Sequence, residues 1–214
     1  MILSERNAQM REFFDRKADG YDDVHAKFMD GKTLLTTHLP AGARRILDLG
    51  GGTGMELIPL FEAHPDAHVT VIDISPEMLK ALAARPFADK LTIICGDFFK
   101  VDFGKDYDAV ISTSALHHFL PQMKAPLYKK IADALKYEGF FLNCDKIADD
   151  KADEATMLQY YYDNFASGRH CDTPLAVSTE IELMENAGLH QFEVYPAFDR
   201  EYRLIMGQKI TFTA

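Results

Sequence analysis

A glycine-rich run directly after a short apolar segment is the feature that most restricts the fold of this chain. Residues 45–49 have the length and apolar character of a buried β-strand, and Asp48–Gly54 has the sequence Asp-Leu-Gly-Gly-Gly-Thr-Gly. Glycines here let the backbone turn sharply and approach a ligand, because no Cβ atom is in the way. A β-branched run ends near Asp73, nineteen residues after Gly54, and a carboxylate at about that distance can bind ribose hydroxyls. The pattern predicts a site for an adenosine-containing cofactor.

Strand-like and helix-like segments alternate through the middle of the chain, which predicts right-handed crossovers and a parallel sheet with helices on both faces. The strands expected there are 45–49, 69–74, 91–95, 109–112 and 139–143. Two later strands, 191–195 and 202–206, are separated by a turn too short for a crossover, so we expect an antiparallel hairpin. The expected fold is a Rossmann-like, doubly wound α/β sheet of seven strands, mostly parallel, with an antiparallel C-terminal hairpin.

Residue types at helix ends predict where two of the connecting helices begin. Thr53 and Glu56 have the spacing of a capping box, which favours a helix over 53–63, kinked at Pro59. Ser75 is expected to be the N-cap of a helix that has Pro76 at its first position and ends at about residue 84.

Two further helices are predicted in the second half of the chain. One covers 127–137, with Pro126 at its start and Gly139 just past its end. The other covers 179–187, with Thr179 and Glu182 as a capping box and a glycine after it.

The chain is expected to form a single domain over residues 1–214, with two segments outside the alternation. These are 1–40 and 147–177, which carry aromatic residues among charged ones and are expected to be helical additions that cover one end of the sheet. A homodimer is compatible with this organisation.

Composition excludes some partners. Lysine and arginine number 23 against 33 acidic residues, a net charge of −10, which argues against nucleic acid as the main partner because such binding depends on cationic contacts to phosphates. The N-terminal residues are polar and no apolar run reaches membrane-spanning length. The three cysteines have neither a disulfide framework nor a zinc spacing. We therefore expect a cytoplasmic protein without membrane association.

The spacing of the glycines distinguishes between several kinds of cofactor-binding site. A dinucleotide fingerprint needs G-x-G-x-x-G, and its third glycine would fall on Met55 or Leu57 here. A phosphate-binding P-loop needs a lysine after its glycines, and none is present in this run. What remains is G-x-G-x-G after an acidic strand end.

The run Asp48–Gly54 resembles motif I of the class I S-adenosylmethionine-dependent methyltransferases, and later segments resemble further motifs of that family in the right order. These are Val71–Ser75, Gly96–Phe98, Ser112–Phe119 and Leu135–Phe140, within a likeness that spans about 13–209. One departure is Gly51, where the family more often has cysteine or alanine; we expect it to add only flexibility. The resemblance implies S-adenosyl-L-methionine as cofactor and S-adenosyl-L-homocysteine as product.

The resemblance also implies which residues bind the cofactor. Asp73 would bind the ribose, Asp97 the adenine amino group, and Asp48 would shape the glycine loop or receive the methionine ammonium group. Tyr21 matches a tyrosine of the N-terminal lid found in small-molecule members, which makes 1–40 a lid and 147–177 an insertion near the acceptor pocket. The complete set is Tyr21, Asp48, Gly50, Gly52, Gly54, Asp73, Ile74, Met78, Asp97, Phe98 and Ser114.

Methyl transfer is a direct displacement at an activated sulfonium, so alignment supplies most of the catalysis. A base is needed only when the attacking atom carries a proton, and His117 or His118 is the candidate because the loop that holds them borders the methyl group. The alternative is that both histidines only pack. His170, Cys171 and Asp172 have the residue types of a metal site but no partner cluster in the sequence, so no metal site is predicted.

The sequence favours a methyltransferase that acts on a small molecule. Methylation of RNA or protein is the alternative among enzymes, although the Asn/Asp-Pro-Pro-Tyr-like motif typical of base amine methylation is replaced here by Ser112–Ala115. A related variant would make a modified cofactor instead. A non-catalytic cofactor-binding regulator is the alternative from another class.

Overall fold

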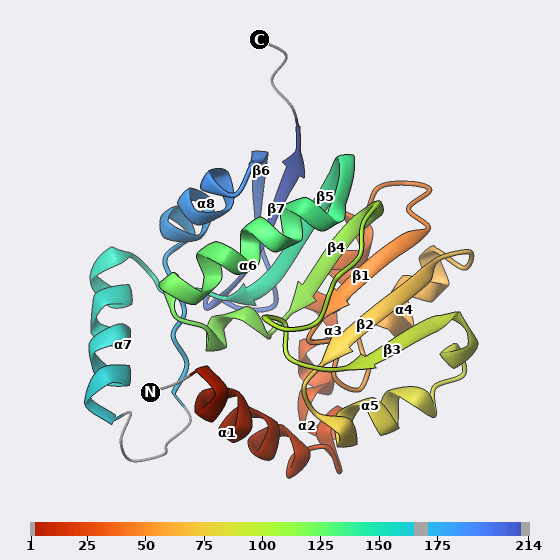
Figure 1. Ribbon diagram of the computed structural model, residues 1–214, viewed down its shortest axis with the longest axis horizontal. Coiled ribbons are helices and arrows are strands. Elements are labelled where there is room, and N and C mark those ends of the chain that lie inside the picture. Colours follow the sequence, from red (N-terminus) through yellow and green to blue (C-terminus); the bar gives the residue numbers. More distant parts are fainter. Residues whose placement is uncertain (1–2, 165–170, 211–214) are drawn as a thin grey trace.

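The computed structural model describes residues 3–164 and 171–210 as one α/β sheet domain (Figure 1). Its seven strands are β1 (Arg45–Leu49), β2 (His68–Asp73), β3 (Leu91–Cys95), β4 (Tyr107–Thr113), β5 (Leu135–Lys146), β6 (Leu189–Pro196) and β7 (Tyr202–Lys209). They lie in the order β3-β2-β1-β4-β5-β7-β6. All pairs from β3 to β5 are parallel, whereas β7 is antiparallel to both neighbours. The predicted fold class and the C-terminal hairpin are confirmed.

The helices in chain order are α1 (Leu3–Asp15), α2 (Tyr21–His25), α3 (Met29–Thr37), α4 (Leu57–Ala63), α5 (Pro76–Ala83), α6 (Pro121–Ala134), α7 (Lys151–Asn164) and α8 (Val177–Asn186). Short 3₁₀ turns occupy Ala26–Phe28, Ala88–Lys90 and Leu116–His118. Figure 1 shows α6 and α8 in front of the sheet and α3 and α4 behind it, with α1 below the lower ends of the strands. None of the described helices has the length and apolar composition needed to cross a bilayer.

Each face of the sheet packs its own apolar core, because side chains alternate along a strand. In β1, Leu47 and Leu49 join the core under α6 and α8, whereas Ile46 joins the core under α3, α4 and α5. Asp48 follows the same alternation toward the second core but is a carboxylate at 0% exposure. The strand therefore places one charged group in an otherwise apolar layer at its carboxyl end.

Of the predicted helix starts, only that of α5 is confirmed. The Ser75 hydroxyl accepts a hydrogen bond from the Met78 N–H at 3.2 Å, and Pro76 is the first helical residue. The capping box at Thr53 and Glu56 is wrong, because both side chains bond to the N-terminal segment and α4 begins later, at Leu57. Pro59 consequently lies in the first helical turn, where its missing N–H is not needed, so no kink is required.

Two other helix starts also differ from the prediction. Helix α6 begins at Pro121, so that Pro126 lies inside it, and it ends at Ala134 because β5 already starts at the next residue. Helix α8 begins at Val177 after Ala176, which places Thr179 within its first turn, and the predicted capping box is wrong. In both helices, packing against the sheet outweighed the residue types that predicted the helix start.

A buried polar network joins α6 to α8. Lys124 is 0% exposed and Glu180 2% exposed, and their side chains form an ion pair. The Tyr128 hydroxyl donates to the other oxygen of Glu180. The pKa of this tyrosine is raised mainly by burial and also by the negative charge of Glu180. Removing one member would leave a charge without compensation in a region that excludes water.

We expect Glu180→Ala to lower the free energy of unfolding by about 3–5 kcal/mol, because Lys124 would lose its counter-charge while staying buried. Urea unfolding followed by circular dichroism measures this. The control is Asp133→Ala on α6, the helix that carries Lys124; the ion pair of Asp133 with Lys129 is exposed and should contribute less than about 1 kcal/mol. Equal effects of the two substitutions would contradict the expectation.

Candidate active site

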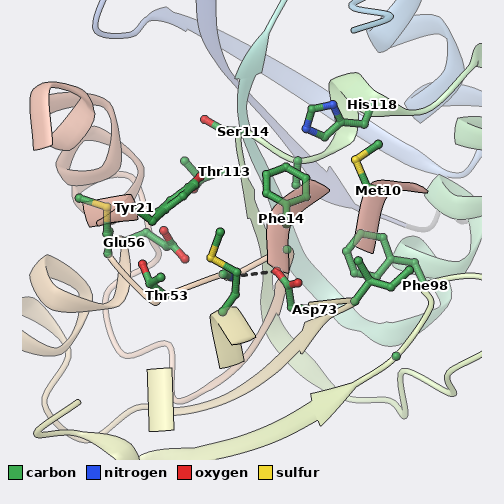
Figure 2. A pocket seen from close by; sticks show the side chains of 18 of the residues that line it. Met10, Phe14, Tyr21, Thr53, Glu56, Asp73, Phe98, Thr113, Ser114 and His118 are labelled. Carbon is green, nitrogen blue, oxygen red and sulfur yellow. Dashed lines mark hydrogen bonds between the residues drawn. The ribbon is translucent and has the colours of Figure 1, made fainter. Parts of the chain in front are cut away.

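The carboxyl ends of β1, β2 and β4 meet at a cavity of about 770 Å³, open mouth included. The Gly50 N–H donates to the Ile72 carbonyl at 2.8 Å, which ties the glycine loop to the end of β2. In the view of Figure 2, Tyr21, Thr53 and Glu56 lie on the left of this cavity, Met10, Phe98 and His118 on the right, and Phe14 and Asp73 between them. A parallel sheet binds ligands at this position.

Most of the predicted cofactor residues line the cavity, namely Tyr21, Gly50, Gly52, Asp73, Ile74, Met78, Asp97, Phe98 and Ser114. Asp48 and Gly54 are not among the lining residues and support the loop from behind. Of the two histidines, His118 lines the cavity and His117 does not. Thr113, Ala115 and Phe119, which also line the cavity, belong to Ser112–Phe119, the segment that resembles a family motif. Sequence reasoning did not assign the lining residues Asn7, Met10, Phe14, Lys32, Thr53 and Glu56 to the site.

Close packing explains two of the glycines. A Cβ on Gly50 would lie 2.5 Å from Ala115 Cβ, and φ at Gly50 is +81°, so a side chain is excluded by both contact and conformation. A Cβ on Gly51 would lie 2.6 Å from Asp48 Oδ2 and 2.6 Å from Val71 Cγ1. The expectation that Gly51 adds only flexibility is therefore wrong: its lack of a side chain makes room for the Asp48 carboxyl.

Asp73 is held at the end of β2 by two backbone N–H groups. Its Oδ2 accepts from Gly52 at 2.9 Å and its Oδ1 from Ser75 at 2.8 Å. Burial raises the pKa of Asp73 to about 6, although these backbone hydrogen bonds oppose the shift. Each oxygen keeps further acceptor capacity, so the carboxylate can receive two ligand hydroxyls.

Behind the glycine loop, Asp48, Glu56 and Lys32 form a buried charged cluster. Lys32 Nζ donates to Glu56 Oε2 at 2.7 Å, and the exposed fractions of the two residues are 7% and 3%. Burial, and then the neighbouring Glu56, raise the pKa of Asp48 well above its usual value. A protonated Asp48 leaves one negative charge on the pair of acids, and Lys32 balances that charge.

The N-terminal segment is bonded to the nucleotide-binding elements. The Thr53 hydroxyl donates to Asp22 Oδ1 at 2.6 Å, and Arg85 forms an ion pair with the other oxygen of Asp22. The Ser75 hydroxyl donates to Asp15 Oδ1 at 2.6 Å. These contacts cross from residues 15–22 to the glycine loop and α5, and they hold Tyr21 against the cavity.

Asp97 lies after β3 at the far side of the cavity. Its Oδ1 accepts from the Phe99 N–H at 2.9 Å, while its Oδ2 is buried without a hydrogen bond and has Lys100 Nζ at 3.5 Å. A buried acceptor without a hydrogen bond costs free energy unless a ligand donor satisfies it. Phe98 and Met78 supply apolar surface beside it.

The loop after β4 carries the two histidines. Ser114 has φ +54°, a strained value for a residue with a side chain. His117 Nδ1 lies 2.5 Å from Asp145 Oδ1, and its backbone N–H donates to Asp145 Oδ2 at 2.8 Å. Burial would raise the pKa of Asp145, but the charge and hydrogen bond of His117 hold it below the usual value. Asp145, at the end of β5, was not predicted.

Asp172 approaches both histidines. Its Oδ1 lies 3.3 Å from His118 Nδ1 and 3.7 Å from His117 Nε2. The sequence places Asp172 beside His170 and Cys171; His170 is outside the described residues, and Cys171 is buried in a small apolar cluster with Leu120 and Tyr161. The two histidines that Asp172 approaches are thus more than fifty residues away in the chain.

Comparisons with known proteins agree with this site. The family described as a methyltransferase domain matches residues 46–139. The carboxy-S-adenosyl-L-methionine synthase of Nautilia profundicola is 30% identical over 167 residues, which cover 70% of this chain and 71% of that protein. The chain belongs to the class I S-adenosylmethionine-dependent methyltransferase family.

Two further similar proteins are longer than this chain. The malonyl-[acyl-carrier protein] O-methyltransferase of Herminiimonas arsenicoxydans is 34% identical over 131 residues, which cover 60% of this chain and 48% of that protein. The solved structure of mitomycin 7-O-methyltransferase superposes with a TM-score of 0.72 at 21% identity, over 93% of this chain and 57% of that one. The chain therefore spans about half the length of these two.

The residues present fit S-adenosylmethionine, the cofactor of this family. Its sulfonium and ammonium groups are cationic, and the cavity is lined by the acids Glu56, Asp73 and Asp97 with Lys32 as the one basic lining residue among those described. Asp73 is placed to bind the ribose hydroxyls, and the unsatisfied Asp97 Oδ2 can accept from the adenine amino group. Glu56 Oε1 is likewise buried without a hydrogen bond, and Glu56 lines the cavity.

Cofactor affinity should decrease as the pH is lowered through the pKa of Asp73. The pKa of its carboxyl is about 6, and only the ionised form accepts two hydroxyl donors, so binding should be about tenfold weaker at pH 5 than at pH 7. Calorimetry with S-adenosylhomocysteine between pH 5 and pH 7 measures this, because the ligand's amino group stays protonated throughout that pH range. Asp73→Asn should bind more weakly and without this slope; a wild-type affinity that is constant from pH 5 to 7 would refute the assignment.

Proposed function

We propose that this methyltransferase transfers the methyl group to a hydroxyl oxygen of a small, largely apolar acceptor molecule. The observation that carries the proposal is the part of the cavity around His118, which we name the acceptor compartment. Its walls are Met10 and Phe14 from α1, Phe119, and His118 as a polar group among them. The Phe14 and His118 rings have their centres 5.5 Å apart, and Met10 lies beside His118 in Figure 2. An apolar compartment with one convergent polar side chain is typical of small-molecule sites.

Helices α1 and α7 support the proposal that residues 1–40 form a lid and that 147–177 lie near the acceptor. Arg6 donates to the His118 carbonyl, and its guanidinium lies 4.6 Å from the centre of the Tyr161 ring. Asn7 and Met10 of the same helix line the cavity. In this arrangement α1 restricts the size of the acceptor, which disfavours a folded RNA or protein substrate.

Charge supports a small neutral acceptor over a phosphorylated one. Lys32 is the one basic residue among the described residues of the cavity wall, and Glu56 already binds its ammonium group. A phosphate or nucleic acid would lack cationic partners there. The relative from Herminiimonas arsenicoxydans, at 34% identity, is by its name an O-methyltransferase, which favours oxygen as the attacking atom.

In the proposed reaction the cofactor supplies an activated methyl group on a sulfonium sulfur. The residues of this chain hold the acceptor oxygen in line with that methyl group and exclude water around it. His118 contacts the acceptor hydroxyl, and His117 is a positioning residue that Asp145 fixes from behind. The alternative function, a non-catalytic cofactor-binding regulator, would not need a polar group in the acceptor compartment.

We expect His118→Ala to lower kcat by roughly 100-fold or more, because the side chain that touches the acceptor is lost. The affinity for S-adenosylhomocysteine should change less than about threefold, since the cofactor residues of this cavity are elsewhere. A screen of phenols, alcohols, amines and thiols, read by mass for the gain of one methyl group, identifies the acceptor class first. His68→Asn is the matched control, because His68 bonds to Thr92 at the sheet edge.

The screen also tests the alternatives. Methylation of RNA or protein with no small-molecule product would overturn the proposal, as would binding of the cofactor without turnover on any acceptor. The relative from Nautilia profundicola is by its name a carboxy-S-adenosyl-L-methionine synthase. Appearance of a heavier, carboxylated cofactor in place of a methylated acceptor would assign that reaction here instead.

A further inference from the structure

Three potential metal ligands converge beside the acceptor compartment, and His118 is the one of them that lines it. His117, His118 and Asp172 each offer one ligand atom, and these atoms all lie within 4.8 Å of one another. The histidines are 5% and 6% exposed, while Asp172 is partly open to solvent at 31% of its side chain. Two imidazoles and a carboxylate form the ligand set of many catalytic metal sites, which leave a coordination position open.

We propose that His117 Nε2, His118 Nδ1 and Asp172 Oδ1 bind one divalent transition-metal ion such as Zn²⁺, with an open position toward the acceptor. Binding of the ion is independent of the reaction catalysed. Its role in activating an acceptor hydroxyl rests on the proposed function.

The hydrogen bonding of His117 supports this assignment. Asp145 Oδ1 lies 2.5 Å from Nδ1, so Nδ1 carries the hydrogen and Nε2 presents its lone pair on the side of Asp172. The second Asp145 oxygen accepts the His117 backbone N–H and fixes the ring further. A carboxylate on the far nitrogen of a ligating histidine is the usual support of such a ligand.

The distances require only a small contraction. Two ligands of a tetrahedral zinc site lie about 3.4 Å apart when each bond is about 2.1 Å. The separations to Asp172 Oδ1 are 3.3 Å from His118 and 3.7 Å from His117. The remaining pair, between the two histidines, is no longer than 4.8 Å, so it closes by about 1.4 Å at most, a shift that ring rotation can supply.

The surrounding charges also suit a cation. Lys146 Nζ lies 3.5 Å from Asp172 Oδ2 and 3.7 Å from Glu201 Oε2. Oδ2 of Asp172 thus pairs with the Lys146 ammonium group, and Oδ1 lies toward the two histidines. Asp145, beside His117, and Glu201, beside Lys146, add carboxylates around the three ligand groups, and negative charge of this kind favours a bound cation.

The ion would act as a Lewis acid on the acceptor. A hydroxyl that coordinates at the open position has a lowered pKa and releases its proton to water. The oxygen then forms a bond to the methyl carbon as the carbon–sulfur bond breaks, and that electron pair stays on sulfur, which becomes a neutral thioether. No oxidant or reductant is involved.

The test is metal binding by the full chain, measured without turnover. Metal-free protein is titrated with Co²⁺, followed by its visible absorption, and with Zn²⁺ in competition. One equivalent should bind, and Asp172→Ala and His118→Ala should each weaken binding by about 100-fold or more. Asp145→Asn should weaken it about 10- to 100-fold, and His68→Asn should leave it unchanged.

Two results would overturn the site: no Co²⁺ bound at one equivalent, or an affinity that Asp172→Ala and His118→Ala leave unaltered while both variants keep the wild-type circular dichroism. A second measurement separates this proposal from the proposed function. Full methylation of a hydroxyl acceptor after chelation would reject a role for the ion and leave the proposed function standing. Metal binding with no methylated hydroxyl in any screen would confirm the site and reject the proposed function.

Discussion

The whole site depends on the close contact between the glycine loop and the ends of the neighbouring strands. Gly50 bonds to the Ile72 carbonyl and packs against Ala115 with no room for a side chain, and Gly51 leaves space for the Asp48 carboxyl. This contact brings the loops after β1, β2 and β4 to one place. It fixes Asp73 through the Gly52 N–H, and it sets the distance from the glycine loop to the histidine loop. A Cβ at either glycine would push these elements apart, so the cofactor and acceptor sides of the cavity are coupled through backbone packing.

The second constraint is electrostatic. Asp48 and Glu56 are buried side by side, a costly arrangement unless a proton or a cation compensates. Lys32 from α3 supplies the cation at 2.7 Å from Glu56, and the raised pKa of Asp48 supplies the proton. Helix α3 therefore supplies the charge that lets two acids stay buried behind the glycine loop, although it lies outside every motif.

Sequence reasoning succeeded where a local pattern has one physical meaning. The spacing from the glycines to Asp73 reflects one strand–helix–strand unit, and the Ser75-Pro76 helix start reflects a contact between residues close together in the chain. It failed where a side chain had a choice of partner: Thr53 bonds to Asp22 and Glu56 to Lys32, so neither caps α4. It could not find Lys32 or Asp145, because a single charged residue in a helix or strand has no signature until tertiary packing places it.

The histidine loop shows the same limit with a larger consequence. His117 and His118 are adjacent in sequence, so their side chains were equivalent candidates for catalysis. In the fold one ring is fixed by Asp145 behind the cavity wall and the other lines the cavity. Asp172, which had no partner cluster in the sequence, meets both rings because the chain after α7 returns past the end of β5, where Ala148 pairs with Ala176. The two histidines, which the sequence offers as candidate general bases, and Asp172, which it leaves isolated, thus form one group. The chemistry of the acceptor compartment belongs to that group as a whole.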